Sequence, residues 1–166
     1  MRTMLNSVRE RREHEEGFTL IELMVVVLII AILIAIAIPT FLGARDSAND
    51  RAAQSSLRNG LTAAKTLYTD VGDWTTATKA ALEGVEPSLT FEASPTVSGN
   101  AKTVSFAVAA GSQTIALAGL SKAGECFWVR DTAVADATYT KAGTFYGKNT
   151  TACTGTNALA AGGAGW

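Results

Sequence analysis

A run of mostly apolar residues near the amino terminus constrains this chain more than any other feature. It extends from Phe18 to Ile38, reads FTLIELMVVVLIIAILIAIAI, and contains Glu22 as its single charge. At 1.5 Å per residue, a helix over this run spans about 31 Å, which matches the hydrocarbon core of a bilayer. The run therefore predicts a membrane-spanning helix and argues against a purely cytosolic protein.

The apolar run divides the chain into a charged leader (1–17), the span (18–38) and a longer part (39–166) without a comparable span. The leader holds four arginines and four glutamates. Acidic residues count little in the positive-inside rule. Three leader arginines lie close to the span, against Arg45 and Arg51 on its other side. We therefore expect the leader to be cytoplasmic and the longer part to face outward.

A second helical pattern follows Pro39. Its apolar positions recur every four or three residues, which is typical of an amphipathic helix; they are Leu57, Leu61, Ala64, Tyr68 and Val71. Gly72 is placed to end it. Together with the span this predicts one helix, roughly 80 Å long and bent near Pro39. No domain of this size can cover such a helix, so half of it must lie against lipid or other copies of the chain.

The remaining sequence changes to an alternating pattern typical of strands. A short helix is expected at Thr76–Glu83, ended by Gly84. Closely spaced strands then predict an antiparallel sheet over about residues 102–146, packed on the amphipathic half of the helix. We expect the tail, Thr150–Trp166, to be a loop, and the fold class to be α+β. The four strand candidates are 103–108, Gln113–Leu120, Glu125–Asp131 and Tyr139–Tyr146.

The junction between leader and span, Gly17-Phe18-Thr19-Leu20-Ile21-Glu22-Leu23, resembles the class III signal of type IV prepilins and pseudopilins. The resemblance covers about residues 11–39. It implies that a prepilin peptidase cuts after Gly17, that the new amine of Phe18 is N-methylated, and that Glu22 pairs with a neighbour's amino terminus during assembly. Pro39 falls where the family has its helix-bending proline. The 17-residue leader is longer than that of many pilins that begin with Phe.

From this resemblance we expect a structural subunit of a type IV pilus, built from copies of itself with the helices at the centre. An assembly ATPase and a platform protein would extract it from the cytoplasmic membrane into an extracellular filament. The alternative is a pseudopilin of a type II secretion or competence system. Major secretion pseudopilins carry acidic calcium ligands near the carboxy terminus, whereas no Asp or Glu follows Asp136 here. The pilus is therefore the favoured interpretation.

Composition gives little support to an enzyme or a nucleic-acid-binding protein. The one histidine, His14, lies in the leader, so a mature chain would lack His-based triads and the common zinc sites. No P-loop or nucleophile elbow is present. The net charge of −1 offers no electrostatic case for nucleic acid. We expect no catalytic residue, no cofactor and no metal.

Cys126 and Cys153 are the two cysteines of the chain. An even pair in an exported protein predicts one disulfide, which would hold the carboxy-terminal loop, 126–153, against the sheet. Two free buried thiols are the alternative. Trp74, Trp128 and Trp166 are expected to be core or loop anchors.

Two other interpretations of the span remain open at this point. One is an uncleaved signal anchor that holds an unrelated domain. The other is an ordinary secretory signal, because Ala35-Ile36-Ala37 fits the A-x-A cleavage rule. For Glu22 itself, a carboxylate that snorkels to water near the interface is as compatible with the sequence as one that pairs before assembly.

Overall fold

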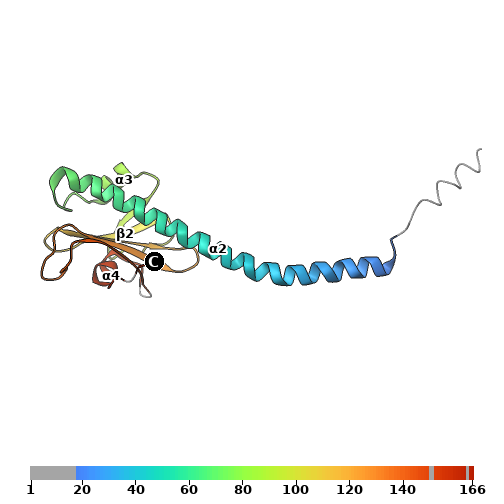
Figure 1. The fold of residues 1–166 in the computed structure, drawn as a ribbon. Coiled ribbons are helices and arrows are strands. Elements are labelled where there is room, and N and C mark those ends of the chain that lie inside the picture. Colours follow the sequence, from blue (N-terminus) through green and yellow to red (C-terminus); the bar gives the residue numbers. More distant parts are fainter. Residues whose placement is uncertain (1–17, 150–151, 164) are drawn as a thin grey trace, which may run out of the picture. The chain divides into compact units, whose positions relative to one another are not determined.

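The computed structural model describes residues 18–149, 152–163 and 165–166. The chain divides after Gly43 into two compact units. A single helix, α2 (Leu20–Val71), runs through the boundary between them and contains Pro39 (Figure 1). The leader and its Gly17 lie outside the described residues. The long continuous helix is confirmed, and the bend near Pro39 stays a prediction.

In the second unit, α2 ends where the sequence indicates. Gly72 has φ +83°, the left-handed conformation that glycine adopts without strain, and its N–H donates to the Tyr68 carbonyl at 2.7 Å. Next comes α3 (Lys79–Val85), capped by Thr78, whose Oγ1 accepts from the Ala81 N–H at 3.3 Å. The expected boundaries of this short helix are wrong. Thr78 is its N-cap, so the helix begins three residues later than Thr76, and Gly84, expected to end it, lies within it.

One five-stranded sheet follows, in the order β1-β2-β3-β4-β5. Its expected all-antiparallel pairing is wrong at one edge, where β1 runs parallel to β2. The other neighbours are antiparallel. With only four residues, β1 is too short to show an alternating pattern. The strands are β1 (Thr90–Ala93), β2 (Thr103–Val108), β3 (Thr114–Leu120), β4 (Cys126–Thr132) and β5 (Gly143–Asn149).

The last strand begins later than the sequence suggests. Asp136 Oδ1 accepts from the N–H groups of Thr138 and Tyr139, each at 2.7 Å, and this turn occupies the start of the expected strand. The tail is also not a loop throughout. It contains α4 (Gly155–Ala160), capped by Thr154, whose Oγ1 accepts from the Asn157 N–H at 3.2 Å.

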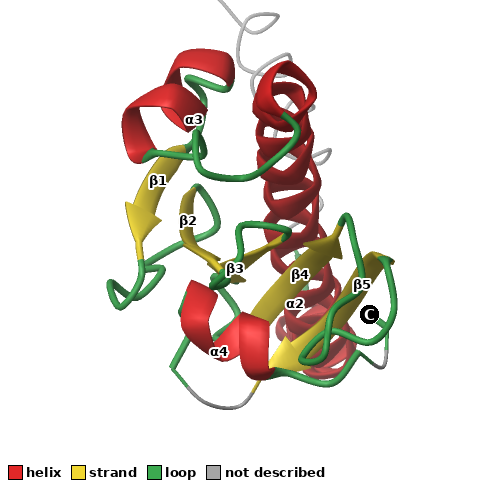
Figure 2. Ribbon diagram, turned by 90° about the vertical axis from the view of Figure 1, so that its left-hand side faces the viewer, coloured by secondary structure: helices red, strands yellow, loops and turns green. Residues whose placement is uncertain are grey.

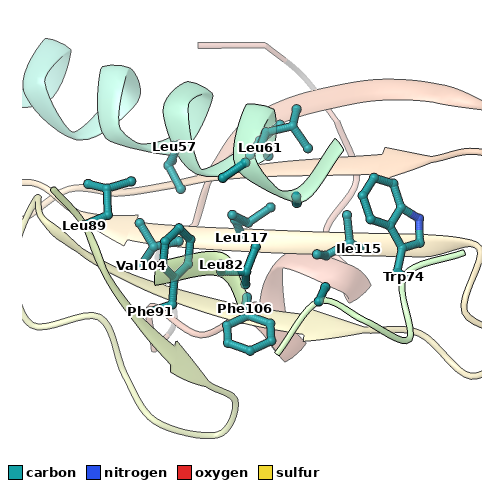
Figure 3. Packing of buried hydrophobic residues seen from close by; sticks show 14 of the residues in the cluster. Leu57, Leu61, Trp74, Leu82, Leu89, Phe91, Val104, Phe106, Ile115 and Leu117 are labelled. Carbon is teal, nitrogen blue, oxygen red and sulfur yellow. The ribbon is translucent and has the colours of Figure 1, made fainter. Parts of the chain in front are cut away.

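The sheet lies between the carboxy-terminal half of α2 and α4 (Figure 2). On the α2 side, Leu57 and Leu61 pack with Leu117 and Trp74 in the main core (Figure 3). Gly119 lets the helix approach closely, since a Cβ there would lie 3.3 Å from Leu57. The predicted stripe is buried at Leu57, Leu61 and Ala64, half-buried at Tyr68 and exposed at Val71.

The opposite face of the sheet carries a second, smaller core, which was not expected. Its members alternate along β3 and β4 with those of the main core, as the period of a strand requires, and the tail completes it; the buried residues are Ala116, Ala118, Cys126, Trp128, Cys153 and Ala158. Since α4 covers this face, the strands are apolar on both sides. Trp74 and Trp128 are buried, as predicted for anchors.

Candidate functional site

The first turn of α2 holds the single charge of the apolar span. Thr19 precedes the helix and donates twice to Glu22 Oε2, from its N–H at 3.0 Å and from its Oγ1 at 2.8 Å. The Glu22 N–H donates back to Thr19 Oγ1 at 3.3 Å. This reciprocal arrangement is a capping box, and an acidic group at this end also favours the helix dipole.

Thr19 is a residue that the sequence analysis missed. The signal was available, since Thr-x-x-Glu directly before an apolar run is the sequence pattern of a capping box. Among the described residues, Glu22 Oε1 has no hydrogen-bond donor. The carboxylate is thus held in place through one oxygen, and its second oxygen is free to accept from another group.

The side chains that surround Glu22 along the span are exposed. Phe18 is 82% exposed, and every large apolar side chain from Leu20 to Ile38 is also solvent-accessible in the single chain. α2 is the one helix in the described part of the chain that is long and apolar enough to cross a membrane. An uncovered apolar surface of this size requires lipid or protein against it.

Pro39 interrupts the hydrogen bonding of α2 at the end of the span, because proline has no N–H to donate to the carbonyl four residues before it. The carbonyl left without this donor is that of Ala35. At the next position Thr40 Oγ1 donates to the Ile36 carbonyl at 3.0 Å, which adds a side-chain donor to the carbonyl that the Thr40 N–H faces. A Cβ at Gly43 would meet no atom within 4 Å. Pro39 thus lies in a part of α2 with weakened internal hydrogen bonding.

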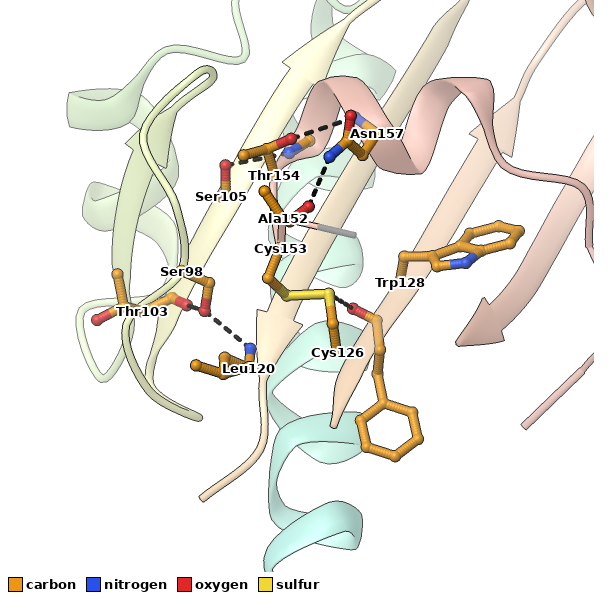
Figure 4. Close-up of a disulfide and its surroundings, with 12 residues drawn as sticks. Ser98, Thr103, Ser105, Leu120, Cys126, Trp128, Ala152, Cys153, Thr154 and Asn157 are labelled. Carbon is orange, nitrogen blue, oxygen red and sulfur yellow. Dashed lines mark hydrogen bonds between the residues drawn. A yellow bond between two sulfur atoms is a disulfide. The ribbon is translucent and has the colours of Figure 1, made fainter. Parts of the chain in front are cut away.

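The two cysteines lie on the α4 side of the sheet. Cys126 begins β4, Cys153 precedes α4, and the two form a disulfide with their Cα atoms 5.5 Å apart (Figure 4). Ser98 joins the same region, because its N–H donates to the Cys153 carbonyl at 2.9 Å and its Oγ accepts from the Leu120 N–H at 2.8 Å. The disulfide therefore ties the tail to β4, and the hydrogen bond from Ser98 ties it to the loop before β2.

The first turn of α2 presents one carboxylate, with an oxygen still open to a donor, on an exposed apolar surface. No three His, Cys, Asp or Glu side chains gather in a metal-binding group within residues 18–149, 152–163 and 165–166. Glu22 has apolar neighbours and Thr19 as its one polar partner in that range. What this geometry can do is neutralise a cation that reaches the first turn of the helix.

A comparison with protein-family models agrees with this geometry. Residues 13–38 match the prokaryotic N-terminal methylation motif. This segment is the class III signal of type IV pilins and pseudopilins. No curated protein and no solved structure matches the chain. The signal and the apolar helix together fit a membrane-anchored precursor of a pilin-like or pseudopilin protein.

Proposed function

We propose that the chain is a structural subunit of a type IV pilus. The observation that carries this proposal is Glu22, the single charge of the exposed apolar span 18–38, held by Thr19 within a class III signal. A carboxylate costs roughly 2.5–3.5 kcal/mol at the centre of a membrane helix. Glu22 lies at the helix end, where the cap reduces this cost, and a cation at Oε1 would offset what remains. Cleavage between Gly17 and Phe18 creates an amine on the same segment of every copy.

That amine suits Glu22 of a second copy. It lies at the end of the same apolar helix, so two parallel helices offset along their axes bring one amine to one carboxylate. Glu22 Oε1 is the acceptor that remains after Thr19 has used Oε2. Repetition of this pair, with the apolar surfaces packed together, builds a helical homopolymer. Prepilin peptidase, an assembly ATPase and a platform protein are the machinery that such a subunit needs.

The test is the composition of surface filaments. Filaments sheared from cells that express the chain should contain a main subunit that begins at Phe18 and is heavier by one methyl group on its amine. Mass spectrometry of the intact subunit and of its amino-terminal peptide measures both. A subunit that begins at Met1 or at Ile38 would contradict the proposal, because it would indicate a signal anchor or a secretory signal.

A pseudopilin of a secretion or competence system shares this assembly chemistry and would have the same mature amino terminus. It would be found in the envelope and not as the main subunit of long sheared filaments. The described carboxy-terminal region favours the pilus, because it is fixed by the disulfide and by α4, and no acidic residue follows Asp136. Electron microscopy of the sheared fraction separates the two.

A further inference from the structure

A groove of about 1030 Å³ opens on the α4 side of the sheet, in the second unit. Its walls come from the end of β1, the end of β2, α4, and the segment between β4 and β5. Sites for single small ligands occupy about 300–1,000 Å³, so this groove has room for a short oligomer. It lies on the sheet face opposite to α2, the helix through which the proposed filament assembles.

The charge in the groove is of one sign. Arg130 and Lys141 line it, and no acidic residue does so among the residues that the structure describes. The acids nearest in sequence lie outside this lining. Asp131 pairs with Lys65 at 2.9 Å, and Asp136 keeps its charge but accepts from the backbone of its own turn. The groove therefore presents positive charge that is not neutralised from within.

Arg130 is held rigidly in the wall of this groove. Its Nη1 donates to the carbonyls of Leu159 and Ala161, at 2.9 and 2.8 Å, which fixes the guanidinium at the end of α4. Its Cζ lies 5.1 Å from the ring centre of Tyr139 and 5.2 Å from that of Phe145. The buried Nε has no acceptor in the described part of the chain. Since Nε is buried, it does not face a ligand, and the capacity that remains is that of Nη2, for which the described part of the chain shows no hydrogen bond. The group is thus pre-organised with Nη2 as its open donor.

The rest of the lining is rich in hydroxyl groups and aromatic rings. Ser94 and Thr156 form one pair, with their oxygens 2.6 Å apart, and Thr138 and Thr140, on either side of Tyr139 in the sequence, also line the groove. Hydroxyl groups can donate to and accept from other hydroxyl groups, and aromatic rings offer apolar area to the C–H face of a sugar. A cationic side chain adds selectivity for an acid.

We propose that this groove binds an acidic saccharide, a short stretch of a polymer of uronic-acid type, with Arg130 and Lys141 at its carboxylates. The orientation of the groove in a filament rests on the proposed function, because assembly through α2 leaves this face of the sheet toward solvent. Binding itself needs only the folded second unit and not the filament.

The experiment uses the full chain in detergent micelles and measures binding by isothermal titration. Trigalacturonate is the probe, and its methyl ester is the matched control that removes the charges but keeps the sugar. The ester should bind at least about tenfold more weakly, because it cannot form charge-assisted hydrogen bonds. Equal binding of acid and ester, or no binding of either, would overturn the proposal.

Variants locate the site. Lys141 is exposed, so Lys141→Gln should preserve the fold and weaken trigalacturonate binding about two- to fivefold, while Lys141→Glu should weaken it further. Lys122, an exposed lysine outside this groove, supplies the matched Lys122→Gln and Lys122→Glu controls, which should bind as the unaltered chain does. Equal losses at the two positions would indicate non-specific attraction and overturn the assignment.

Two further measurements distinguish a saccharide from other possible occupants of this groove. Oligoglutamate that competes as well as trigalacturonate would show that any acidic chain binds, which contradicts a sugar site. A micelle-bound oligomer that dissociates in Lys141→Glu but not in Lys122→Glu would show that a second copy occupies the groove. If the micelle-bound chain binds the saccharide but cells that express it form no filaments, the binding site is supported and the proposed function is contradicted.

Discussion

At the scale of single residues, the most informative feature is the capping box between Thr19 and Glu22. It resolves the question of how a carboxylate is tolerated at the start of an apolar helix. Both donors come from Thr19, three residues earlier, and both go to one oxygen. The residue is therefore satisfied locally in a single chain while it keeps an acceptor for a neighbour.

Removal of the carboxylate should abolish assembly and leave membrane insertion intact. Glu22→Ala deletes the only charge of the span, so insertion becomes more favourable, whereas the neighbouring Phe18 amine loses its partner. Breaking a buried pair in this way costs about 3–5 kcal/mol per contact. The measurement compares sheared filaments with the membrane pool in a strain that lacks the unaltered chain.

Thr19→Val is the matched control for Glu22→Ala. It removes the hydroxyl of the cap but keeps the carboxylate, at a cost of about 1 kcal/mol of local helix stability. We expect it to assemble with reduced efficiency. Normal filaments from Glu22→Ala alone would show that the axial register is set by other contacts.

The ion pair between Lys65 and Asp131 is expected to contribute more to stability than an exposed ion pair does, because its carboxylate is buried. Asp131 is buried, and it is held by Lys65 from α2 at 2.9 Å and by a hydrogen bond from Thr144. Lys65→Met leaves this carboxylate with a weaker set of partners, so we expect a loss of about 1–3 kcal/mol in the free energy of unfolding. Urea denaturation of the full chain in micelles measures it.

Lys79→Met is the comparison for Lys65→Met. Lys79 pairs with Glu92 at 2.7 Å, but both side chains are substantially exposed. The hydrogen bond that Lys79 Nζ donates to the Glu92 carboxylate raises the pKa of Lys79 above its ordinary value. An exposed pair contributes about 0–1 kcal/mol, so this variant should change little. A loss as large as that of Lys65→Met would contradict the argument that burial of the carboxylate decides how much each ion pair contributes.

At the scale of elements, α4 depends on a glycine. A Cβ at Gly155 would lie 2.3 Å from the backbone carbonyl carbon of Phe106, and the backbone on both sides leaves no room to move. Gly155→Ala should therefore destabilise the second unit by roughly 1–3 kcal/mol, and more if α4 detaches. Gly84→Ala, in the open part of α3, should instead stabilise by up to about 1 kcal/mol. Thermal unfolding of the two variants compares them.

Some of these elements were predictable from the sequence and others were not. The long helix was predictable because its period repeats over many turns and Gly72 marks its end. The central strands were predictable because apolar and small residues alternate in them. β1 and α4 were not predictable, since they have only four and six residues respectively. β1 is positioned by pairing with β2, and α4 by packing on β2 and β3. At the site, Glu22 was evident from its isolation, whereas Thr19 required attention to the capping pattern.

At the scale of the whole molecule, the chain combines a unit that a membrane or other copies must cover with a unit that has its own core on both sides of a sheet. The second unit does not need the span for its packing, as the described contacts of its core lie within residues 44–166. In the proposed assembly, this separation lets the second unit retain its fold while the first exchanges lipid for protein.

The disulfide contributes to the stability of the second unit. Cys126 and Cys153 enclose a loop that contains β5, and in the chain-entropy model such a bridge contributes roughly 3–4 kcal/mol. That is a large part of the 5–15 kcal/mol that stabilises an ordinary domain. Cys126→Ser with Cys153→Ser should therefore lower the free energy of unfolding by about that amount, as urea denaturation of the full chain under oxidising conditions measures.

The redox state of the same pair also tests the orientation of the chain in the membrane. Cytosolic thiols are kept reduced, whereas an exported domain can be oxidised. If the leader is cytoplasmic and residues 39–166 face outward, alkylation of intact cells followed by non-reducing peptide mapping should find Cys126 joined to Cys153. The joined fraction should fall when arginines are added after Pro39, because the positive-inside rule then favours the opposite orientation. Two thiols that are free to alkylate in the unaltered chain would place the second unit in the cytoplasm, where no surface filament could be built from it.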